Sequence, residues 1–370
     1  MVQEESGVYD NFGFLLKRRS VAAVLLGALC ACASFAQSPD ALLPGPKPHD
    51  IPARWKPWIG EYGWPPEDDV ARAVFVVGEK AGSIMILRRE KQTQDAKYES
   101  IDGFPTNVSP AGPTHRYLAV DQAGYRKFVL GDVSWRKLTP DKNATQQVLI
   151  KPIKSIALLR KEALAATPPK ETGSFRKPDL VELAPLDPSI HLDIRYATLN
   201  DFLSTPVYLQ ARAFLQRPAA EALMRVQQKL KPLGYGLLIH DGYRPWYVTK
   251  VFWDATPPEG KIFVADPAQG SRHNRGCAVD LTLYDLVTGK PIEMPGTYDE
   301  MSPRSFPDYP GGTSLQRWHR DLLRKATESE GFTVYEAEWW HFDYQDWKEY
   351  PILNVPFEKL GSGSAAISVH

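Results

Sequence analysis

Hydrophobic and polar positions follow different patterns in the two halves of this 370-residue chain. In the first half, short β-prone runs at 74–77 and 83–87 are separated by a glycine-containing turn, a pattern typical of a β-hairpin. The runs at 117–120 and 128–130 repeat this arrangement. The pattern predicts a small antiparallel β-rich accessory domain over residues 53–165.

The second half mixes helical and strand periodicity. Leu223, Val226 and Leu230 recur at helical spacing before a proline and a glycine that end the pattern. Apolar and polar positions together predict two helices and two strands: 219–230, 314–330, 237–239 and 278–283. Because helices and strands are interspersed, we expect an α+β domain over residues 178–360.

The N-terminal segment predicts export. A basic stretch at 17–19 precedes an apolar run at 21–33 and small residues, with cleavage expected after Ala36. The run is shorter than the about 20 residues that span a bilayer, so residues 1–36 are interpreted as a signal peptide of a periplasmic or secreted protein, without a transmembrane span. The sequence around Cys32 resembles a lipobox, and the alternative is a lipoprotein anchored to a membrane through Cys32.

Composition predicts the remaining boundaries and excludes some partners. Proline-rich and polar residues predict a spacer at 37–52, a linker at 166–177 and a flexible tail at 361–370. Lys+Arg and Asp+Glu both total 44, and this zero formal net charge argues against nucleic acid as a partner. Cys277 is the one cysteine of three outside the export segment, so no disulfide is expected within the mature chain.

Histidine and carboxylate residues with metal-ligand chemistry lie in the second half. A catalytic zinc takes three protein ligands and leaves a fourth position for water. His273, Asp280 and His341 supply two nitrogens and one oxygen, and Gly276 allows the chain to turn between the first two. A histidine six residues from an aspartate is also a common hydrogen-bonded structural pair, so both interpretations stay open at this point.

Glu338 and Arg244 fit hydrolytic chemistry. Glu338 lies three residues before His341 beside two tryptophans, and a dry environment raises a carboxyl pKa toward the range of a general base. Arg244 is permanently cationic, and its planar fork suits a carboxylate or a developing oxyanion. A solvated strand end and a surface turn are the structural alternatives for these two residues.

Five ordered blocks resemble the zinc D-alanyl-D-alanine dipeptidases of the VanX type, in peptidase family M15, subfamily D. The matching blocks are 194–198, 234–238, 241–245, 271–283 and 338–342. These dipeptidases share a fold with D-Ala-D-Ala carboxypeptidases and the Hedgehog signalling domain. The resemblance therefore implies a C-terminal zinc peptidase domain of this type, one Zn²⁺ per chain and a D-Ala-D-Ala-type dipeptide as substrate.

The resemblance also implies a role for each matching residue. The implied roles are zinc ligands for His273, Asp280 and His341, general base for Glu338, oxyanion stabilisation for Arg244, and contact with the substrate's free ammonium for Tyr196, Ser271 and Asp299. A carboxylate at position 299 suits a dipeptide because it can pair with an N-terminal amine. The chain departs from the family at Cys277, which replaces a small residue and is expected to be buried rather than nucleophilic.

Together these features predict an exported zinc metallopeptidase that hydrolyses D-Ala-D-Ala-type dipeptides. One alternative is a D,D-carboxypeptidase acting on longer peptidoglycan stem peptides. The other is a non-enzymatic cell-wall binding protein. The β-rich domain is expected to have a structural or binding role, with peptidoglycan as its expected partner.

Overall fold

The computed structural model describes residues 39–63, 75–88, 97–100, 116–120, 122–123, 125–130, 132–138, 150–300 and 302–361. The predicted signal peptide, Cys32 and the predicted tail beyond Gly361 lie outside the described residues. Among the helices within these ranges, none combines the length and the apolar character that a membrane span requires.

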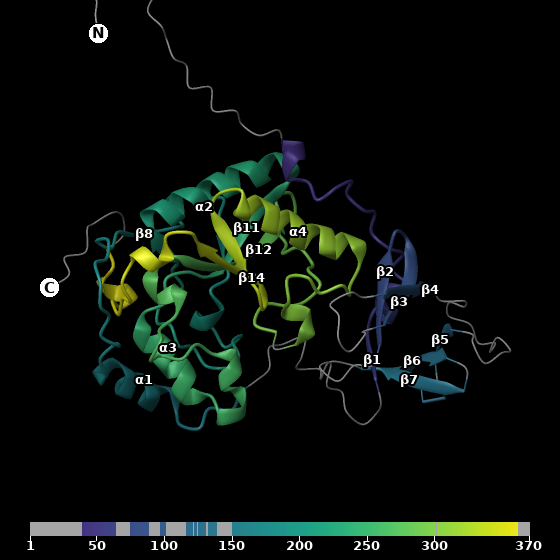
Figure 1. The fold of residues 1–370 in the computed structure, drawn as a ribbon, viewed down its shortest axis with the longest axis horizontal. Coiled ribbons are helices and arrows are strands. Elements are labelled where there is room, and N and C mark those ends of the chain that lie inside the picture. The colour runs from purple at the N-terminus through teal and green to yellow at the C-terminus, as the bar shows by residue number, and fades with distance from the viewer. Residues whose placement is uncertain are drawn as a thin grey trace, which may run out of the picture. The chain divides into compact units, whose positions relative to one another are not determined.

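The described residues form three sheets and four α-helices (Figure 1). The helices are α1 (Ile156–Ala165), α2 (Arg217–Leu230), α3 (Trp246–Ala255) and α4 (Ser314–Glu328). The strands are β1 (Gly60–Gly63), β2 (Phe75–Lys80), β3 (Ser83–Arg88), β4 (Lys97–Ser100), β5 (Arg116–Val120), β6 (Arg126–Leu130), β7 (Val133–Lys137), β8 (Leu180–Glu182), β9 (His191–Leu192), β10 (Phe214–Gln216), β11 (Tyr235–Asp241), β12 (Ala278–Asp285), β13 (Phe332–Tyr335) and β14 (Glu338–Tyr344).

The N-terminal sheet contains β1 to β7 in the order β4-β3-β2-β1-β7-β6-β5. Every neighbouring pair is antiparallel, and β2 and β3 form a hairpin around Ala81 and Gly82. Gly82 has a φ of 78°, a left-handed conformation that glycine adopts at little cost. The buried core of this sheet is small and includes Tyr62, Ile86 and Phe128.

The C-terminal sheet has the order β13-β14-β12-β11-β9. β11 pairs with β9 in parallel, and the other neighbouring strands are antiparallel. β11 is buried along its whole length, and β12 is buried except at Asp285. The apolar run at 237–239 and the apolar residues on either side of Asp280 and Thr282 fill buried positions, which is why the segments 237–239 and 278–283 are recognisable in the sequence.

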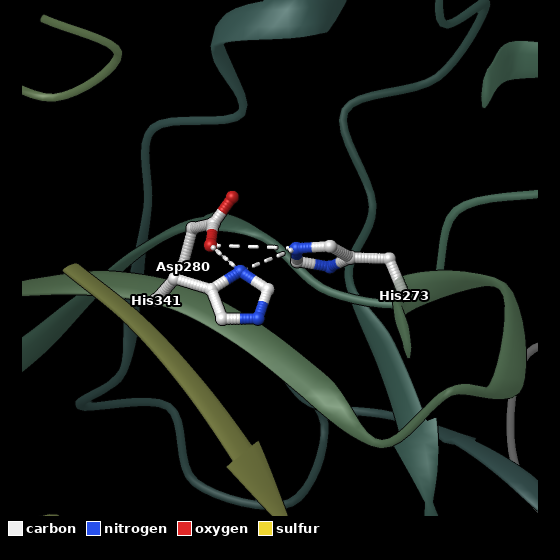
Figure 2. A group of neighbouring side chains, drawn as sticks. All are labelled: His273, Asp280 and His341. Atoms are coloured by element: carbon white, nitrogen blue, oxygen red, sulfur yellow. Dashed lines mark hydrogen bonds and ion pairs between the residues drawn. The ribbon is translucent and has the colours of Figure 1, made fainter. Parts of the chain in front are cut away.

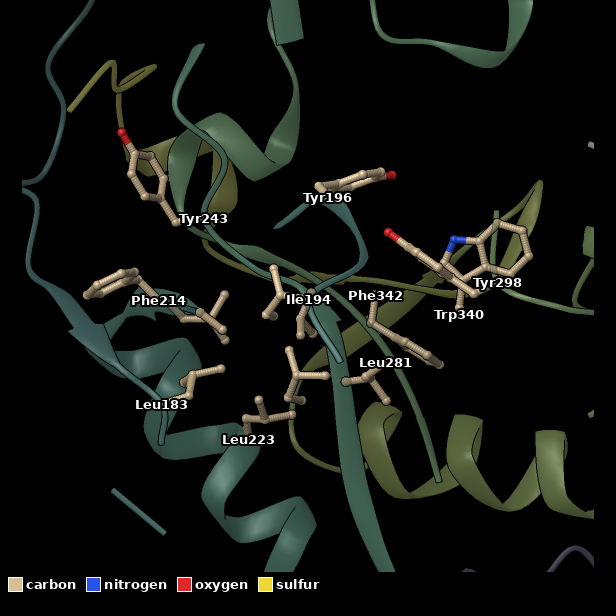
Figure 3. Close-up of a cluster of buried hydrophobic side chains, with 14 of the residues drawn as sticks. Leu183, Ile194, Tyr196, Phe214, Leu223, Tyr243, Leu281, Tyr298, Trp340 and Phe342 are labelled. Atoms are coloured by element: carbon tan, nitrogen blue, oxygen red, sulfur yellow. The ribbon is translucent and has the colours of Figure 1, made fainter. Parts of the chain in front are cut away.

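Helices α2 and α4 cover one face of the C-terminal sheet (Figure 1). α2 contains the predicted helix 219–230, and its apolar side chains lie against the sheet; Figure 3 shows Leu223 of α2 near Leu281 and Phe342 of the strands. α4 begins at the predicted residue because Thr313 and Gln316 form a capping box. It ends at Glu328, two residues before the predicted end.

Helices α1 and α3 lie on the other side of this sheet and pack against each other (Figure 1). Ile156, Leu159 and Ala163 of α1 belong to the same hydrophobic cluster as Val248 and Phe252 of α3. The core of the C-terminal half therefore includes a helix that precedes the expected linker at 166–177. The apolar residues of α1 recur at helical spacing, so one face of the helix must be covered.

Candidate active site

Three neighbouring side chains come from two adjacent strands and the turn before them. Asp280 of β12 and His341 of β14 are directly paired, so they lie on the same face of the sheet. His273 lies in the 3₁₀ helix η7 (Arg272–Arg275). Gly276 follows with a φ of 69°, a left-handed conformation that glycine adopts at little cost, and it turns the chain between His273 and Asp280.

The ring nitrogens and the carboxylate of this cluster converge (Figure 2). Asp280 Oδ1 lies 3.4 Å from His273 Nε2 and 3.1 Å from His341 Nδ1, and the two nitrogens are 3.1 Å apart. All three residues are buried. His273, Asp280 and His341 thus form a group that could hold a metal ion.

Hydrogen bonds behind the cluster determine which atoms face its centre. His273 Nδ1 lies 2.7 Å from the Gly242 carbonyl, and His341 Nε2 lies 3.0 Å from Asp343 Oδ1. Both partners only accept, so these nitrogens carry the protons and the inward nitrogens present lone pairs. Asp280 Oδ1 lies within 3.4 Å of both inward nitrogens. Three buried acceptor atoms that face one another need a cation between them, so these residues fit a metal.

The electrostatics of His341 lead to the same conclusion. Burial lowers the pKa of this imidazole, but hydrogen bonds and charge from Asp280 and Asp343 outweigh burial and raise the pKa to about 10. The surroundings of the cluster therefore favour positive charge at its centre, which a bound metal ion supplies.

Glu338 lies in the same pocket although it is three residues from His341 on a strand. Regular alternation would place the two residues on opposite faces. The pairing of β13 with β14 shifts register here: Val334 pairs with Phe342, but Tyr335 pairs with Glu338. The irregularity turns both side chains to one side, and Glu338 Oε2 lies 3.8 Å from His341 Nδ1.

The environment of Glu338 suits proton transfer. Burial raises the pKa of its carboxyl group above the ordinary value, and the charge of Asp280 raises it further, although His341 acts in the opposite direction. The side chain remains 33% exposed, so it still reaches the open part of the pocket. A carboxylate with a raised pKa is a better proton acceptor near neutral pH.

Arg244 is held in place beside the cluster. Its Nε and Nη2 donate to Asp241 Oδ2 at 3.0 and 2.8 Å. Its guanidinium lies over the rings of Tyr196 and Phe252 and 4.0 Å from Asp280 Oδ2. Asp241 follows a second register shift, in β11, so strand irregularities flank the site on two strands.

Asp299 lies across the pocket with an unusual backbone and an unpaired oxygen. Its φ is 57°, in the left-handed region that residues with a Cβ rarely adopt. Tyr196 donates its hydroxyl to Asp299 Oδ1 at 3.2 Å, whereas Oδ2 is buried without a hydrogen-bond partner among the residues that the structure describes. Burial, with the nearby charges of Asp280 and Glu338, raises the pKa of this carboxyl well above its usual range. Negative charge on this carboxyl is therefore unfavourable unless a cation binds beside it.

All eight site residues predicted from the sequence line one pocket of about 600 Å³. Ser271 is among them, and its hydroxyl accepts from the His273 backbone N–H at 3.3 Å, which caps η7.

Cys277, predicted to be buried, has no exposed surface, and burial raises the pKa of its thiol. A buried thiol of this kind is a poor nucleophile.

Sequence reasoning missed four residues that support the site. Asp343 orients His341, Asp241 holds Arg244, and the Gly242 carbonyl orients His273. Tyr298 donates its hydroxyl to Asp280 Oδ2 at 3.1 Å. The position of Asp343, two residues after a predicted ligand on a strand, was a usable signal because such residues share a face.

Comparison with known proteins places this pocket in a family. The family model of peptidase M15, described as D-Ala-D-Ala dipeptidase, matches residues 176–359. The D-alanyl-D-alanine dipeptidase of Escherichia coli (strain K12) is 34% identical over 179 residues, which cover 48% of this chain and 91% of that protein. The chain belongs to peptidase family M15.

Other D-alanyl-D-alanine dipeptidases are similar to this chain at comparable identity. The D-alanyl-D-alanine dipeptidase of Enterococcus faecalis is 36% identical over 187 residues, covering 45% of this chain and 92% of that protein. The one from Streptomyces coelicolor is 34% identical over 175 residues, covering 42% and 87%. This M15 chain is therefore a metallopeptidase of the dipeptidase type, as predicted, and the family match begins after the N-terminal sheet.

Proposed function

We propose that this chain is an exported zinc dipeptidase that hydrolyses D-Ala-D-Ala-type dipeptides. The observation that carries the proposal is the buried, unpaired Oδ2 of Asp299 in the pocket that also contains the three converging acceptors and Glu338. A carboxylate without a cation suits the free ammonium of a dipeptide. The names of the M15 relatives support the choice of substrate.

His273, Asp280 and His341 would hold one zinc ion per chain. Two imidazole nitrogens and one carboxylate oxygen match a catalytic zinc site with an open fourth position. When bound, zinc polarises a substrate carbonyl and acidifies water. Metal analysis of the purified chain tests this choice: near-equimolar zinc supports it, and another metal that restores more activity contradicts it.

Glu338 would act as the general base and proton carrier. In this role it accepts the proton of the attacking water and returns it to the amine of the leaving D-alanine. Its raised pKa and its place 3.8 Å from His341 Nδ1 support the assignment. Arg244 would stabilise the negative charge that develops on the carbonyl oxygen, because Asp241 holds its guanidinium beside the cluster.

Tyr196, Ser271 and Asp299 would bind the substrate's ammonium. Asp299 Oδ2 supplies the charge, and Tyr196 holds Oδ1 of the same carboxylate. The Ser271 hydroxyl, which caps η7, lies at the wall of the same pocket. In a longer substrate the corresponding amine is acylated and uncharged, so it could not form an ion pair with Asp299.

Three substrates test the proposal: D-Ala-D-Ala, L-Ala-L-Ala and N-acetyl-D-Ala-D-Ala. We expect rapid release of alanine from D-Ala-D-Ala and little cleavage of the acetylated compound, which cannot pair with Asp299. Asp299→Asn should narrow this preference. Cleavage of the acetylated compound alone would contradict dipeptidase activity and favour a D,D-carboxypeptidase.

The basic stretch at 17–19 and the apolar run at 21–33 support export to the periplasm or medium. Cell fractionation tests this, and Cys32→Ala distinguishes a cleaved signal peptide from a lipid anchor: release of the variant from the membrane would show a lipid anchor.

The N-terminal sheet is proposed to contact peptidoglycan. Sedimentation of the purified chain with isolated cell walls tests this contact, and an unchanged supernatant would contradict it.

A further inference from the structure

The loop that carries Asp299 lies between two cavities. This Asp299 loop, residues 295–300 and 302–313, is the second part of the connection from β12 to α4. Ser302 and Phe306 line the active-site pocket, whereas Arg304 and Tyr309 line a second cavity of about 600 Å³ together with Glu61 of β1. Tyr298 anchors the start of the loop by packing on His240 and Trp340. The part of the loop that follows Asp299 lies between the two cavities, and polar contacts connect it to the N-terminal sheet.

Glu61 of the N-terminal sheet makes the first of these contacts. This buried carboxylate accepts from the Tyr309 hydroxyl at 2.5 Å and lies 3.8 Å from Arg304 Nε. Arg304 Nε also donates to Glu300 Oε1 at 2.5 Å, and Glu300 directly follows Asp299 in the chain. A continuous polar network therefore extends from β1 to the residue beside Asp299.

Glu79 of β2 holds the other end of the loop. Its backbone N–H donates to the Gly312 carbonyl at 3.1 Å, and its Oε2 accepts from the backbone N–H of Ser314 at 2.7 Å. Its backbone carbonyl accepts from Arg317 Nη2 at 2.6 Å. Ser314 is the first residue of α4, so a carboxylate from another sheet satisfies a free N–H at the start of this helix.

The backbone of Asp299 needs such support. Its left-handed conformation is disfavoured for a residue with a Cβ, so the surrounding contacts must maintain it. Glu300 makes these contacts: besides Arg304, it accepts from the Thr297 N–H at 2.8 Å and from the Ser302 hydroxyl at 2.7 Å. The Glu300 side chain is thus hydrogen-bonded to residues before and after Asp299 in the chain, and Arg304 connects it to Glu61.

We propose that Glu61 and Glu79 are positioning residues for the substrate: the N-terminal sheet, through the Asp299 loop, sets the affinity for the substrate's ammonium. Neither residue lines the active-site pocket, and both lie before the segment that matches family M15. The inference rests on the proposed function, since Asp299 is the proposed ammonium site.

Steady-state kinetics of the full-length, zinc-loaded Glu61→Gln variant tests this inference. We expect the KM for D-Ala-D-Ala to rise about 10-fold with kcat changed less than about twofold. The reason is that a misplaced Asp299 would weaken the binding of the substrate and of the transition state by the same amount. Metal content should not change. Glu221→Gln, an exposed position on α2, is the matched control and should keep both parameters.

A double-mutant cycle with Asp299→Asn separates positioning from simple docking of the sheet. If Glu61 acts through Asp299, Glu61→Gln should add almost nothing to the loss in kcat/KM that Asp299→Asn already causes. Additive losses would overturn the inference. If Asp299→Asn alone leaves KM unchanged, the proposed ammonium site fails, which is a separate result.

Glu79→Gln and Tyr309→Phe make the test independent of one variant's folding. Each removes part of the contact at one end of the loop, and circular dichroism would identify any variant that does not fold. Both should raise KM in the direction of Glu61→Gln. Unchanged KM in these two folded variants would overturn the inference.

Discussion

The N-terminal and C-terminal sheets differ in how much of each strand they bury. β11 is buried at all of its positions, whereas β5 and β6 each bury two residues of five and β7 buries one. Helices cover one face of the C-terminal sheet and the active-site pocket occupies part of the other, so its strands hold buried polar groups in fixed geometry. The N-terminal sheet has a small core and depends more on its contacts with the rest of the chain.

This difference suggests a division of labour that substitutions can test. Changes in the C-terminal sheet should affect catalysis, metal binding and global stability. Changes in the N-terminal sheet should affect the position of the Asp299 loop, and therefore substrate affinity, with smaller effects on stability.

The largest effect is expected from Glu338→Gln, which removes the proposed proton acceptor but keeps the size of the side chain. We expect kcat to fall roughly 10³-fold, within the range for loss of a general base, with unchanged metal content. Glu336→Gln, an exposed position in the turn before β14, is the matched control. Near-normal turnover in Glu338→Gln would remove Glu338 from the mechanism.

Cavity substitutions compare the two cores directly. Leu281 of β12 and Ile86 of β3 are both buried, and truncation to alanine at such sites costs about 2–5 kcal/mol of unfolding free energy. We expect Leu281→Ala at the upper end of this range and Ile86→Ala at the lower end, because the smaller core can relax around the cavity. Urea unfolding measures both, and equal losses would show that the two cores are equally constrained.

Asp343→Asn should weaken metal binding without abolishing it. The carboxylate accepts from His341 Nε2 and so keeps Nδ1 free to bind a metal. Loss of such an orienting partner typically costs about 10–100-fold in metal affinity. Competition with a chelator measures the affinity, and Asp346→Asn, three residues further along, serves as the control. An unchanged affinity would mean that another contact fixes the orientation of His341.

The smallest effect concerns pH and His319 of α4. Burial, with a smaller contribution from Lys47, lowers the pKa of His319 from 6.5 to about 4. His319 therefore binds a proton more tightly in the unfolded chain than in the folded chain. Its contribution to the free energy of unfolding is complete above pH 6.5 and is lost as the pH falls toward 4. Between pH 7.5 and 6.0 the loss is about 1 kcal/mol.

Urea unfolding at these two pH values, for the parent and for His319→Gln, measures this contribution. The parent should lose more unfolding free energy than the variant over this interval. In the N-terminal sheet, burial lowers the pKa of Lys137 to about 8, so Lys137 changes charge mainly above this interval. Equal pH slopes in the parent and the variant would contradict a neutral buried His319.

The sequence predicted which residues gather in one pocket better than it predicted the backbone that brings them together. All eight predicted residues line one pocket, because residue types and family blocks identify them without knowledge of the backbone. The register shift that brings Glu338 beside His341 has no signature in residue type, and strand alternation alone predicts the opposite arrangement.

Contacts between distant segments were also beyond prediction. Glu61 and Glu79 are single acidic residues in short strands, and their partners in the Asp299 loop lie more than 200 positions away in the chain. The packing of α1 on α3 was missed for a related reason: the composition of 166–177 suggested a boundary, but an apolar helix face does not show which surface will cover it.

The irregular step in β14 has a consequence for the search for metal sites in sequences. Glu-x-x-His spacing is usually attributed to a helix, where residues three apart lie one above the other. Here a distorted strand gives the same proximity, with the backbone extended rather than coiled. Removing the irregularity while keeping the three-residue spacing would place Glu338 and His341 on opposite faces of the strand and separate these two groups. A designer who transfers this four-residue motif to another sheet must therefore transfer its distortion as well.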